Sequence, residues 1–226
     1  MGRAASSVVL VTGASSGIGL HIARALARRG AKVAFAARRR ETLEREVAAV
    51  VADGGQAIAV PLDVTDAAAA TRAVQQVVER FGRVDVLVNN AGNGGELGWW
   101  ADAPPQVARE QFAVHVLGAE HMARAVLPVL RAQRGGVIVN FASTVGYVPM
   151  PGAAIYSAAK AAVNAWSIAL RTELAPESID VRVFSPPHTS TEAGERWPLA
   201  LPKIFEPAWV AEAFVSFLDS NAARAL

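Results

Sequence analysis

The 226-residue sequence contains no cysteine, and this absence excludes disulfide bonds and cysteine-ligated metal sites. Its four histidines, at positions 21, 115, 121 and 188, have no acidic residues at ligand spacing, so we expect no metal. The sequence also lacks an apolar run of about 18 residues and a secretory signal, which predicts a cytoplasmic protein without a membrane partner. Its arginines are scattered and its formal net charge is only +2, which argues against a nucleic-acid-binding face.

What the sequence does contain is an unbroken series of strand patterns, each followed by a helical pattern. We expect strands near residues 7–12, 32–37, 56–61, 84–89, 136–142 and 179–184. This alternation predicts an α/β fold with a Rossmann-like, doubly wound parallel sheet flanked by helices on both faces. No linker interrupts it, so residues 1–226 are expected to form a single domain. The one long connection, residues 185–206, contains four prolines and is predicted to be a substrate lid.

A glycine-rich segment follows the first apolar run. It extends from Thr12 to Gly19 and leads into a helical pattern that ends near Arg29. Glycines in a strand-to-helix turn let the backbone approach a ligand, and the helix N-terminus offers free N–H groups to a diphosphate. The alternative is a glycine-rich turn without a ligand. The residues predicted to bind the cofactor here are Gly13, Ser15, Ser16, Gly17, Ile18 and Gly19.

The second strand pattern ends at Ala37 and is followed by three arginines, with no acid before Glu41. A site selective for NAD would place a carboxylate near this point, whereas an arginine accommodates the 2′-phosphate of NADP. We therefore predict that Arg38 binds NADP (NADPH). Arg39 and Arg40 are interpreted as a solvated charge run.

Tyr156 and Lys160 are one helical turn apart, so both side chains can point into one pocket. A neighbouring cation favours the phenolate and lowers the tyrosine pKa, which suits a general acid or base. Ser143 lies thirteen residues upstream of the tyrosine. By itself the Y-x-x-x-K pattern is weak evidence, and the glycine-rich segment strengthens it.

Together these motifs resemble the short-chain dehydrogenase/reductase family, and the resemblance covers nearly the whole chain. It implies that Ser143 orients a carbonyl, that Tyr156 transfers the proton, and that Lys160 lowers the tyrosine pKa and holds the nicotinamide ribose. It also implies further cofactor contacts next to the third strand, after the fourth strand and in the loop after the sixth. These contacts are Asp63, Val64, Asn89, Ala91, Gly92, Pro186, Thr189 and Thr191.

The sequence departs from the family pattern in three places. His115 occupies the position of an asparagine that is thought to hold a water for proton relay to the lysine. A histidine there could preserve this relay, make it sensitive to pH, or block it. We include His115 among the catalytic candidates; the alternative is a satisfied core histidine. Pro186-Pro187 replaces the usual Pro-Gly of the cofactor loop. The family's last strand has no counterpart.

We therefore predict an NADP(H)-dependent oxidoreductase that transfers a hydride between nicotinamide and an apolar or aromatic ketone or alcohol. The alternatives are a dehydratase, isomerase or epimerase on the same scaffold, or a nucleotide-binding regulatory protein with little turnover. The expected partners are a small-molecule substrate and further copies of the chain, with a dimer favoured over a tetramer. The family resemblance implies that two chains pair through the helices at about 111–131 and 153–175. Substrate contacts are expected from Trp99, Trp100, Tyr147, Met150, Trp197, Leu199 and Leu201.

Overall fold

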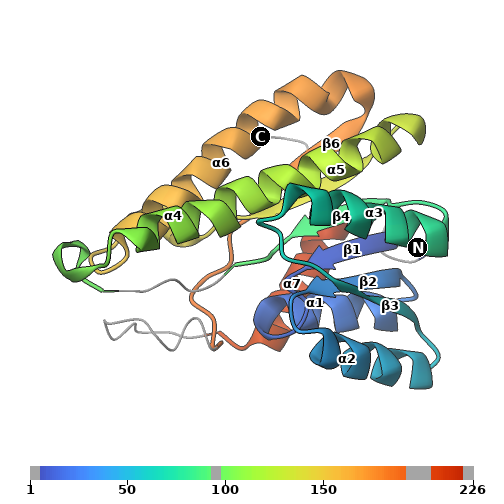
Figure 1. Cartoon of the computed structure of the whole chain (residues 1–226). Helices are drawn as coiled ribbons and strands as arrows, with labels where there is room; N and C mark the ends of the chain where they lie inside the picture. The colour runs from blue at the N-terminus through green and yellow to red at the C-terminus, as the bar shows by residue number, and fades with distance from the viewer. Residues whose placement is uncertain (1–5, 93–97, 192–204, 221–226) are drawn as a thin grey trace.

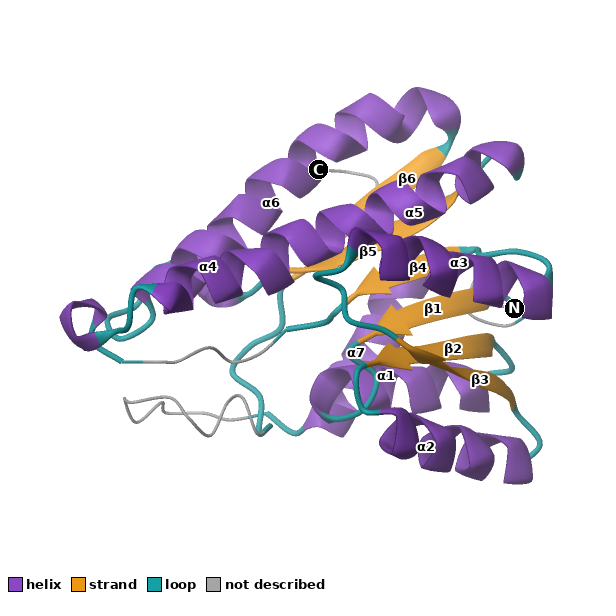
Figure 2. Cartoon of the chain, in the orientation of Figure 1, coloured by secondary structure: helices purple, strands orange, loops and turns teal. Residues whose placement is uncertain are grey.

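Six parallel strands form one sheet through the centre of the structure (Figure 1, Figure 2). The computed structural model describes residues 6–92, 98–191 and 205–220. Across the sheet the strands follow the order β3-β2-β1-β4-β5-β6. Their bounds are β1 Val8–Thr12, β2 Lys32–Ala37, β3 Gln56–Pro61, β4 Val86–Asn89, β5 Gly136–Phe141 and β6 Ile179–Phe184. The sequence predicts all six, and the doubly wound α/β fold is confirmed.

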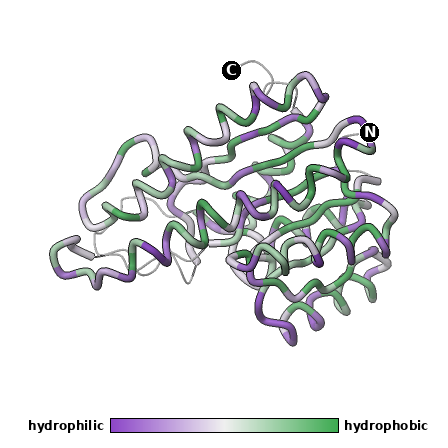
Figure 3. Tube along the Cα trace, turned by 45° about the horizontal axis from the view of Figure 1, so that its top comes forward, coloured by the Kyte–Doolittle hydropathy of each residue, from purple (hydrophilic) through white to green (hydrophobic). Residues whose placement is uncertain are grey.

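Helices cover both faces of the sheet. Their bounds are α1 Gly17–Arg28, α2 Arg40–Ala52, α3 Ala67–Phe81, α4 Gln106–Phe112, α5 Gly118–Ala132, α6 Ala154–Leu174 and α7 Pro207–Asp219. On one face α1 packs against α2 and α7, and on the other α3 packs against α5, with α6 beside β6 (Figure 1). The hydropathy of the helices alternates within each turn, as expected for elements with one buried face (Figure 3).

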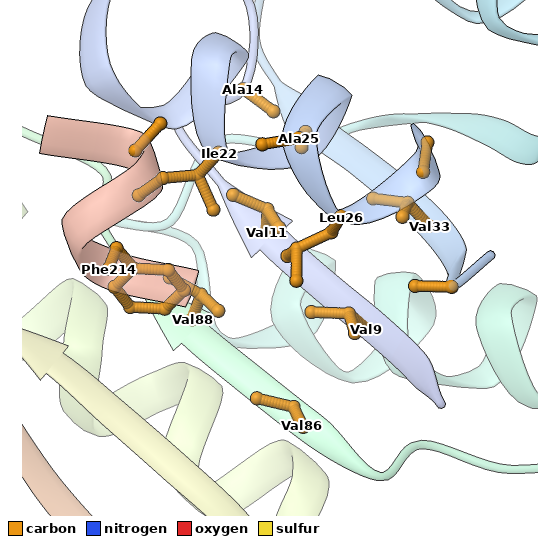
Figure 4. Close-up of a cluster of buried hydrophobic side chains, with 14 of the residues drawn as sticks. Val9, Val11, Ala14, Ile22, Ala25, Leu26, Val33, Val86, Val88 and Phe214 are labelled. Carbon is orange, nitrogen blue, oxygen red and sulfur yellow. The ribbon is translucent and has the colours of Figure 1, made fainter. Parts of the chain in front are cut away.

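The core has two parts because successive side chains of a strand point to opposite faces. In β1, Val9 and Val11 pack with α1 and with Phe214 of α7 (Figure 4). Val8 and Leu10 pack in the second cluster, beneath α3 and α5. All residues of β1 are buried, which explains why Val8–Val11 form a continuous apolar run rather than an alternating pattern.

A buried arginine joins the edge strand β6 to the end of α7. Arg182 is 1% exposed, and its guanidinium pairs with Asp180 at 2.7 Å. It also donates to the carbonyl oxygens of Phe217 at 3.1 Å and Leu218 at 2.9 Å. The last carbonyls of a helix lack intrahelical hydrogen-bond donors and carry partial negative charge. The buried guanidinium of Arg182 supplies the missing donors and offsets that charge.

The helical region before α5 differs from the single helix expected at about 111–131. A π-helical turn, Ala113–Leu117, separates α4 from α5. Such turns are rare and are frequently found at functional sites. Here the turn contains His115, which is 4% exposed.

The apolar surface proposed for pairing two chains is only partly available. Met122 and Val126, expected to contribute to it, are wholly buried in the core under α5. They face the sheet because they lie on the apolar side of the helix. By contrast, Ile168 of α6 is 56% exposed and Leu117 is 51% exposed.

Much of the predicted lid, at 192–204, lies outside the described residues, together with Trp197, Leu199 and Leu201. Its described ends meet, because Phe205 forms a parallel bridge with Thr189. The assignment of residues 185–206 as a lid stays a prediction.

Candidate active site

A cavity of about 850 Å³ lies at the carboxyl ends of the strands, lined by the segments that follow all six of them. β1 and β4 are neighbours in the sheet, but the chain proceeds from them towards opposite edges. In doubly wound folds ligands bind in the crevice at such a switch point. The strand order places the loops after β2 and β3 at one end of the cavity and those after β5 and β6 at the other.

Thr12 and Asn90 fix the glycine-rich loop to the end of β4. The Thr12 hydroxyl donates to Val88 O at 3.1 Å and accepts from the backbone N–H groups of Asn90 and Ala91 at 3.1 and 3.0 Å. The Asn90 amide donates to Thr12 O at 2.9 Å. These bonds satisfy buried backbone groups and hold the loop in one conformation.

The glycines of this loop leave a backbone-lined cradle at the start of α1. A Cβ added to Gly19 would lie 2.3 Å from Asn90 Nδ2 and 2.5 Å from Gly13 O, so only glycine fits. Gly17 has φ +55°, and a Cβ there would lie 3.3 Å from Thr191 Cγ2. The loop after β6 therefore reaches the start of α1. A helix N-terminus enclosed by backbone in this way fits the diphosphate of a dinucleotide.

Two arginines lie at the β2 end of the cavity. Arg38 and Arg39 both line it, and Arg39 Nε donates to Ser15 Oγ at 3.2 Å. Asp63 accepts from the backbone N–H and hydroxyl of Thr65 at 2.9 and 2.7 Å. These bonds lower the pKa of Asp63, and the nearby charge of Arg38 lowers it further. Positive charge and a fixed carboxylate thus meet where the adenosine half of a dinucleotide would bind.

The opposite end of the cavity contains Ser143, Tyr156 and Lys160. Ser143 follows β5, and its hydroxyl forms a hydrogen bond with the Tyr156 phenol. Lys160 is 5% exposed; its Nζ donates to Phe141 O at 2.7 Å and lies 5.7 Å from the centroid of the tyrosine ring. One hydroxyl, one phenol and one amine therefore converge at the same place.

The pKa values of this group differ from the sequence-based expectation. Burial raises the pKa of Tyr156 to about 12, and the hydrogen bond from Ser143 opposes that rise. Burial lowers the pKa of Lys160 to about 7. Both changes have one cause, since a low-dielectric interior disfavours the charged form of each group. The sequence predicts that Lys160 lowers the pKa of Tyr156, whereas in the structure burial raises it.

His115 lies next to Tyr156. Its ring meets the Tyr156 ring edge to face, with centroids 5.4 Å apart. A Cβ added to Gly92 would lie 2.5 Å from His115 Cε1, so the backbone of the loop after β4 packs closely against the imidazole. The π-helical turn thus places His115 between that loop and the tyrosine.

The cavity brings together nearly all the predicted site residues. Those that line it are Gly13, Ser15, Ser16, Gly17, Ile18, Gly19, Arg38, Asp63, Val64, Ala91, Gly92, His115, Ser143, Tyr156, Lys160, Pro186, Thr189 and Thr191. Asn89 is the exception, because it is not among the lining residues. Its amide is buried and donates to Asn140 Oδ1 at 2.9 Å and Ala119 O at 3.2 Å, so it ties β4 to β5 and α5.

Sequence reasoning missed several lining residues, among them Arg39, Asn90 and His188. Of the proposed substrate contacts, Met150 lines the cavity. Trp99, Trp100 and Tyr147 do not, and they are 63%, 69% and 58% exposed. The sequence signal that identifies Arg39 is its place directly after the predicted arginine. His188 could have been found from its position two residues after Pro186.

Comparison with known proteins agrees with this geometry. Residues 7–200 match the model of the short chain dehydrogenase family. The chain belongs to this family. As a member, it is an oxidoreductase.

Two relatives and two solved structures illustrate the range of the similarity. An uncharacterized oxidoreductase of Methylorubrum extorquens is 42% identical over 193 residues, covering 85% of this chain and 77% of its own. A putative ketoacyl reductase of the monensin polyketide synthase from Streptomyces virginiae is 40% identical over 198 residues, covering 87% and 76%. The 3-ketoacyl-(acyl-carrier-protein) reductase of Brucella melitensis, complexed with NADH, has a TM-score of 0.90 at 32% identity, covering 99% of this chain and 95% of that one. An alcohol dehydrogenase of Thermococcus sibiricus, complexed with 5-hydroxy-NADP, has a TM-score of 0.85 at 32% identity, covering 95% and 91%.

Within the described ranges, no group of three or more histidine or acidic side chains is arranged to hold a metal ion. No helix in that part of the chain is long and apolar enough to cross a membrane.

Proposed function

We propose that this protein is an NADP(H)-dependent oxidoreductase that interconverts a ketone and an alcohol. The observation that carries the proposal is a continuous cavity with Ser143, Tyr156 and Lys160 at one end and an arginine pair at the other. The backbone cradle between them suits a diphosphate, so the described residues fit a nicotinamide dinucleotide. Bound there, that cofactor supplies or accepts the hydride.

The chain's own residues manage the proton and the orientation of the substrate. Because its pKa is about 12, Tyr156 is a neutral phenol at pH 7, the form that donates a proton to a ketone oxygen. Ser143 is bonded to the phenol and offers a second contact to the same oxygen. Lys160 lies beside the phenol, where it can bind the ribose and replace the proton that the tyrosine gives up.

The preference for NADP over NAD rests on Arg38 and Arg39. Both side chains line the cavity next to the end of β2, and the bond from Arg39 to Ser15 holds the second guanidinium against the glycine-rich loop. Arginine suits phosphate because its planar fork donates several hydrogen bonds at once. Among similar structures the bound cofactors are mixed, with NADH in one and 5-hydroxy-NADP in another.

The proposed substrate is an apolar or aromatic ketone, in keeping with the side chains of Met150 and Val145 in the cavity wall. We also propose that the protein acts as a homodimer in the cytoplasm. The exposed side chains of Ile168 and Leu117 support pairing through α6 and the start of α5.

The test measures binding of NADPH and NADH by fluorescence, and oxidation of each at 340 nm with a panel of ketones. Loss of one charge-assisted contact to phosphate costs roughly 1.5–3 kcal/mol, or about ten-fold to a hundred-fold in dissociation constant. We expect that loss for NADPH alone in Arg38→Ala and in Arg39→Ala. Arg40→Ala is the matched control, because Arg40 pairs with Glu44 on α2 and is not among the lining residues. Equal affinities of the unmutated protein for the two cofactors would contradict the preference.

Catalysis is tested with Tyr156→Phe, which removes the transferable proton with little change in shape. Turnover should be abolished while NADPH binding stays close to that of the unmutated protein. Substantial residual activity would show that the proton comes from another group.

A further inference from the structure

A histidine of α5 contacts the short segment between β3 and α3. His121 Nδ1 lies 3.0 Å from the carbonyl oxygen of Val64. A carbonyl oxygen only accepts hydrogen bonds, so Nδ1 carries the proton and donates it. Gly118, three residues earlier in α5, packs so closely on the Val64 side chain that an added Cβ would lie 2.6 Å from Val64 Cγ2. The start of α5 therefore contacts both the carbonyl and the side chain of Val64.

The hydrogen bond from His121 acts on Asp63 through a single peptide unit. The carbonyl of Val64 and the N–H of Thr65 belong to one planar trans peptide, so they point in opposite directions. That N–H donates to Asp63 Oδ1 at 2.9 Å, and this bond is the largest of the causes that lower the pKa of Asp63. A donor that fixes the carbonyl therefore also fixes the N–H that holds the carboxylate.

The rest of the segment is held by other contacts. Before it, the Leu62 N–H donates to Ala37 O at 2.9 Å. After it, the Asp66 carboxylate caps α3 by accepting from the N–H groups of Ala68 and Ala69 at 2.8 and 3.0 Å. Neither contact sets the orientation of the peptide between Val64 and Thr65. His121 supplies the bond that does.

Asp63 and Val64 line the cavity at its β3 end, whereas His121 is not among the lining residues. Adenine has a 6-amino group that donates hydrogen bonds. A carboxylate accepts such a bond, and an apolar side chain beside it suits the face of the ring. The two residues that His121 holds are therefore the ones that would contact the base of a dinucleotide.

We propose that His121 is a positioning residue for this base: by fixing the peptide between Val64 and Thr65, it directs the Asp63 carboxylate at the adenine 6-amino group. The inference rests on the proposed function and adds to it a residue from outside the cavity.

The experiment measures binding of NADPH and of its hypoxanthine analogue, which has an oxo group in place of the 6-amino group. Both are fluorescent, so dissociation constants are obtained without turnover. The unmutated protein should bind NADPH more tightly than the analogue. In His121→Leu the ratio of the two dissociation constants should change about 3-fold to 10-fold towards unity, the effect of one neutral hydrogen bond. His121→Asn keeps a donor near the position of Nδ1 and should retain most of the discrimination.

Gln133→Leu is the matched control. The Gln133 amide follows α5 and also bonds a backbone carbonyl, that of Val84 at 2.8 Å, but Val84 precedes β4 and lies at the other end of the sheet. This variant should lose stability and leave the ratio unchanged. Arg38→Ala should weaken both ligands equally, because both carry the 2′-phosphate.

An unchanged ratio in His121→Leu would overturn the inference. An asparagine variant as poor as the leucine variant, or an equal change in Gln133→Leu, would do the same, because the effect would then not come from the donor at position 121. The measurements are repeated with NADH and its hypoxanthine analogue, so a wrong NADP preference leaves the inference testable. If the unmutated protein bound none of the four dinucleotides, the proposed function would fail and the inference with it.

Discussion

Replacing Lys160 by methionine should make the cofactor-free protein more stable while removing the amine that we propose acts in catalysis. Burial lowers the pKa of Lys160 from 10.5 to about 7, so the folded state resists protonation that the unfolded chain accepts. At about 1.36 kcal/mol per pKa unit, the cost of charging this lysine approaches 5 kcal/mol as an upper bound. Methionine has similar length and no charge, but it leaves Phe141 O without its 2.7 Å partner, at a cost of about 1–3 kcal/mol. The net gain expected at low pH is therefore about 2–4 kcal/mol.

The pH dependence makes this prediction specific. Above 10.5 the lysine is neutral in both states, so the unmutated protein has no charging cost. As the pH falls towards 7 the unfolded chain binds the proton first and stability is lost, and below 7 the cost is complete. Urea unfolding at pH 6, 7, 8, 9 and 10 should show the largest advantage for Lys160→Met at pH 6 to 7, narrowing as the pH rises. A difference that does not change with pH, or a less stable variant at pH 6, would refute the reasoning.

Three further predictions concern other parts of the molecule. His115→Asn should keep or raise activity and flatten the acid limb of the pH–rate profile, whereas His115→Leu should lose rate and still bind NADPH; equal rates for leucine and histidine would show that the residue only packs. Arg182→Met should lower the free energy of unfolding by about 3–5 kcal/mol in urea titrations, because it removes the buried guanidinium that pairs with Asp180 and binds the last carbonyls of α7; a loss below 1 kcal/mol would contradict this account. Sedimentation should show a dimer that Ile168→Glu converts to a monomer, and a concentration-independent monomer of the unmutated chain would exclude pairing.

The strands were predictable because a strand buried on both faces has a continuous apolar sequence. Val8–Val11 in β1 and Val33–Ala37 in β2 form such runs, and their ends coincide with the glycine-rich loop and the arginines. The π-helical turn at Ala113–Leu117 was not predictable in this way. One extra residue in a helical turn changes neither the apolar pattern nor the propensity of the segment, and tertiary packing decides where it occurs.

At the site, sequence motifs identified segments more reliably than individual side chains. Asn89 and Asn90 are adjacent at the end of a strand, so they point to opposite sides. The structure shows that Asn90 faces the glycine-rich loop and Asn89 the interior. Similarly, Arg38 and Arg39 both reach the cavity, although the sequence favours only the first. The raised pKa of Tyr156 was also beyond sequence reasoning, because it results from burial, which the sequence does not show.

The contact between α7 and α1 has a consequence for the order in which the chain can fold. Phe214 and Val215 of α7 complete the cluster that contains Val9 and Ile22, so the first strand and helix remain partly uncovered until residues two hundred positions later are synthesised (Figure 4). Contacts between such distant residues form slowly, and an uncovered apolar face favours aggregation during synthesis. Ribosome-bound chains that end before Pro207 should therefore expose the face of α1 that α7 covers. The glycine-rich cradle at the start of α1 would then have a complete core beneath it only after α7 has packed against α1.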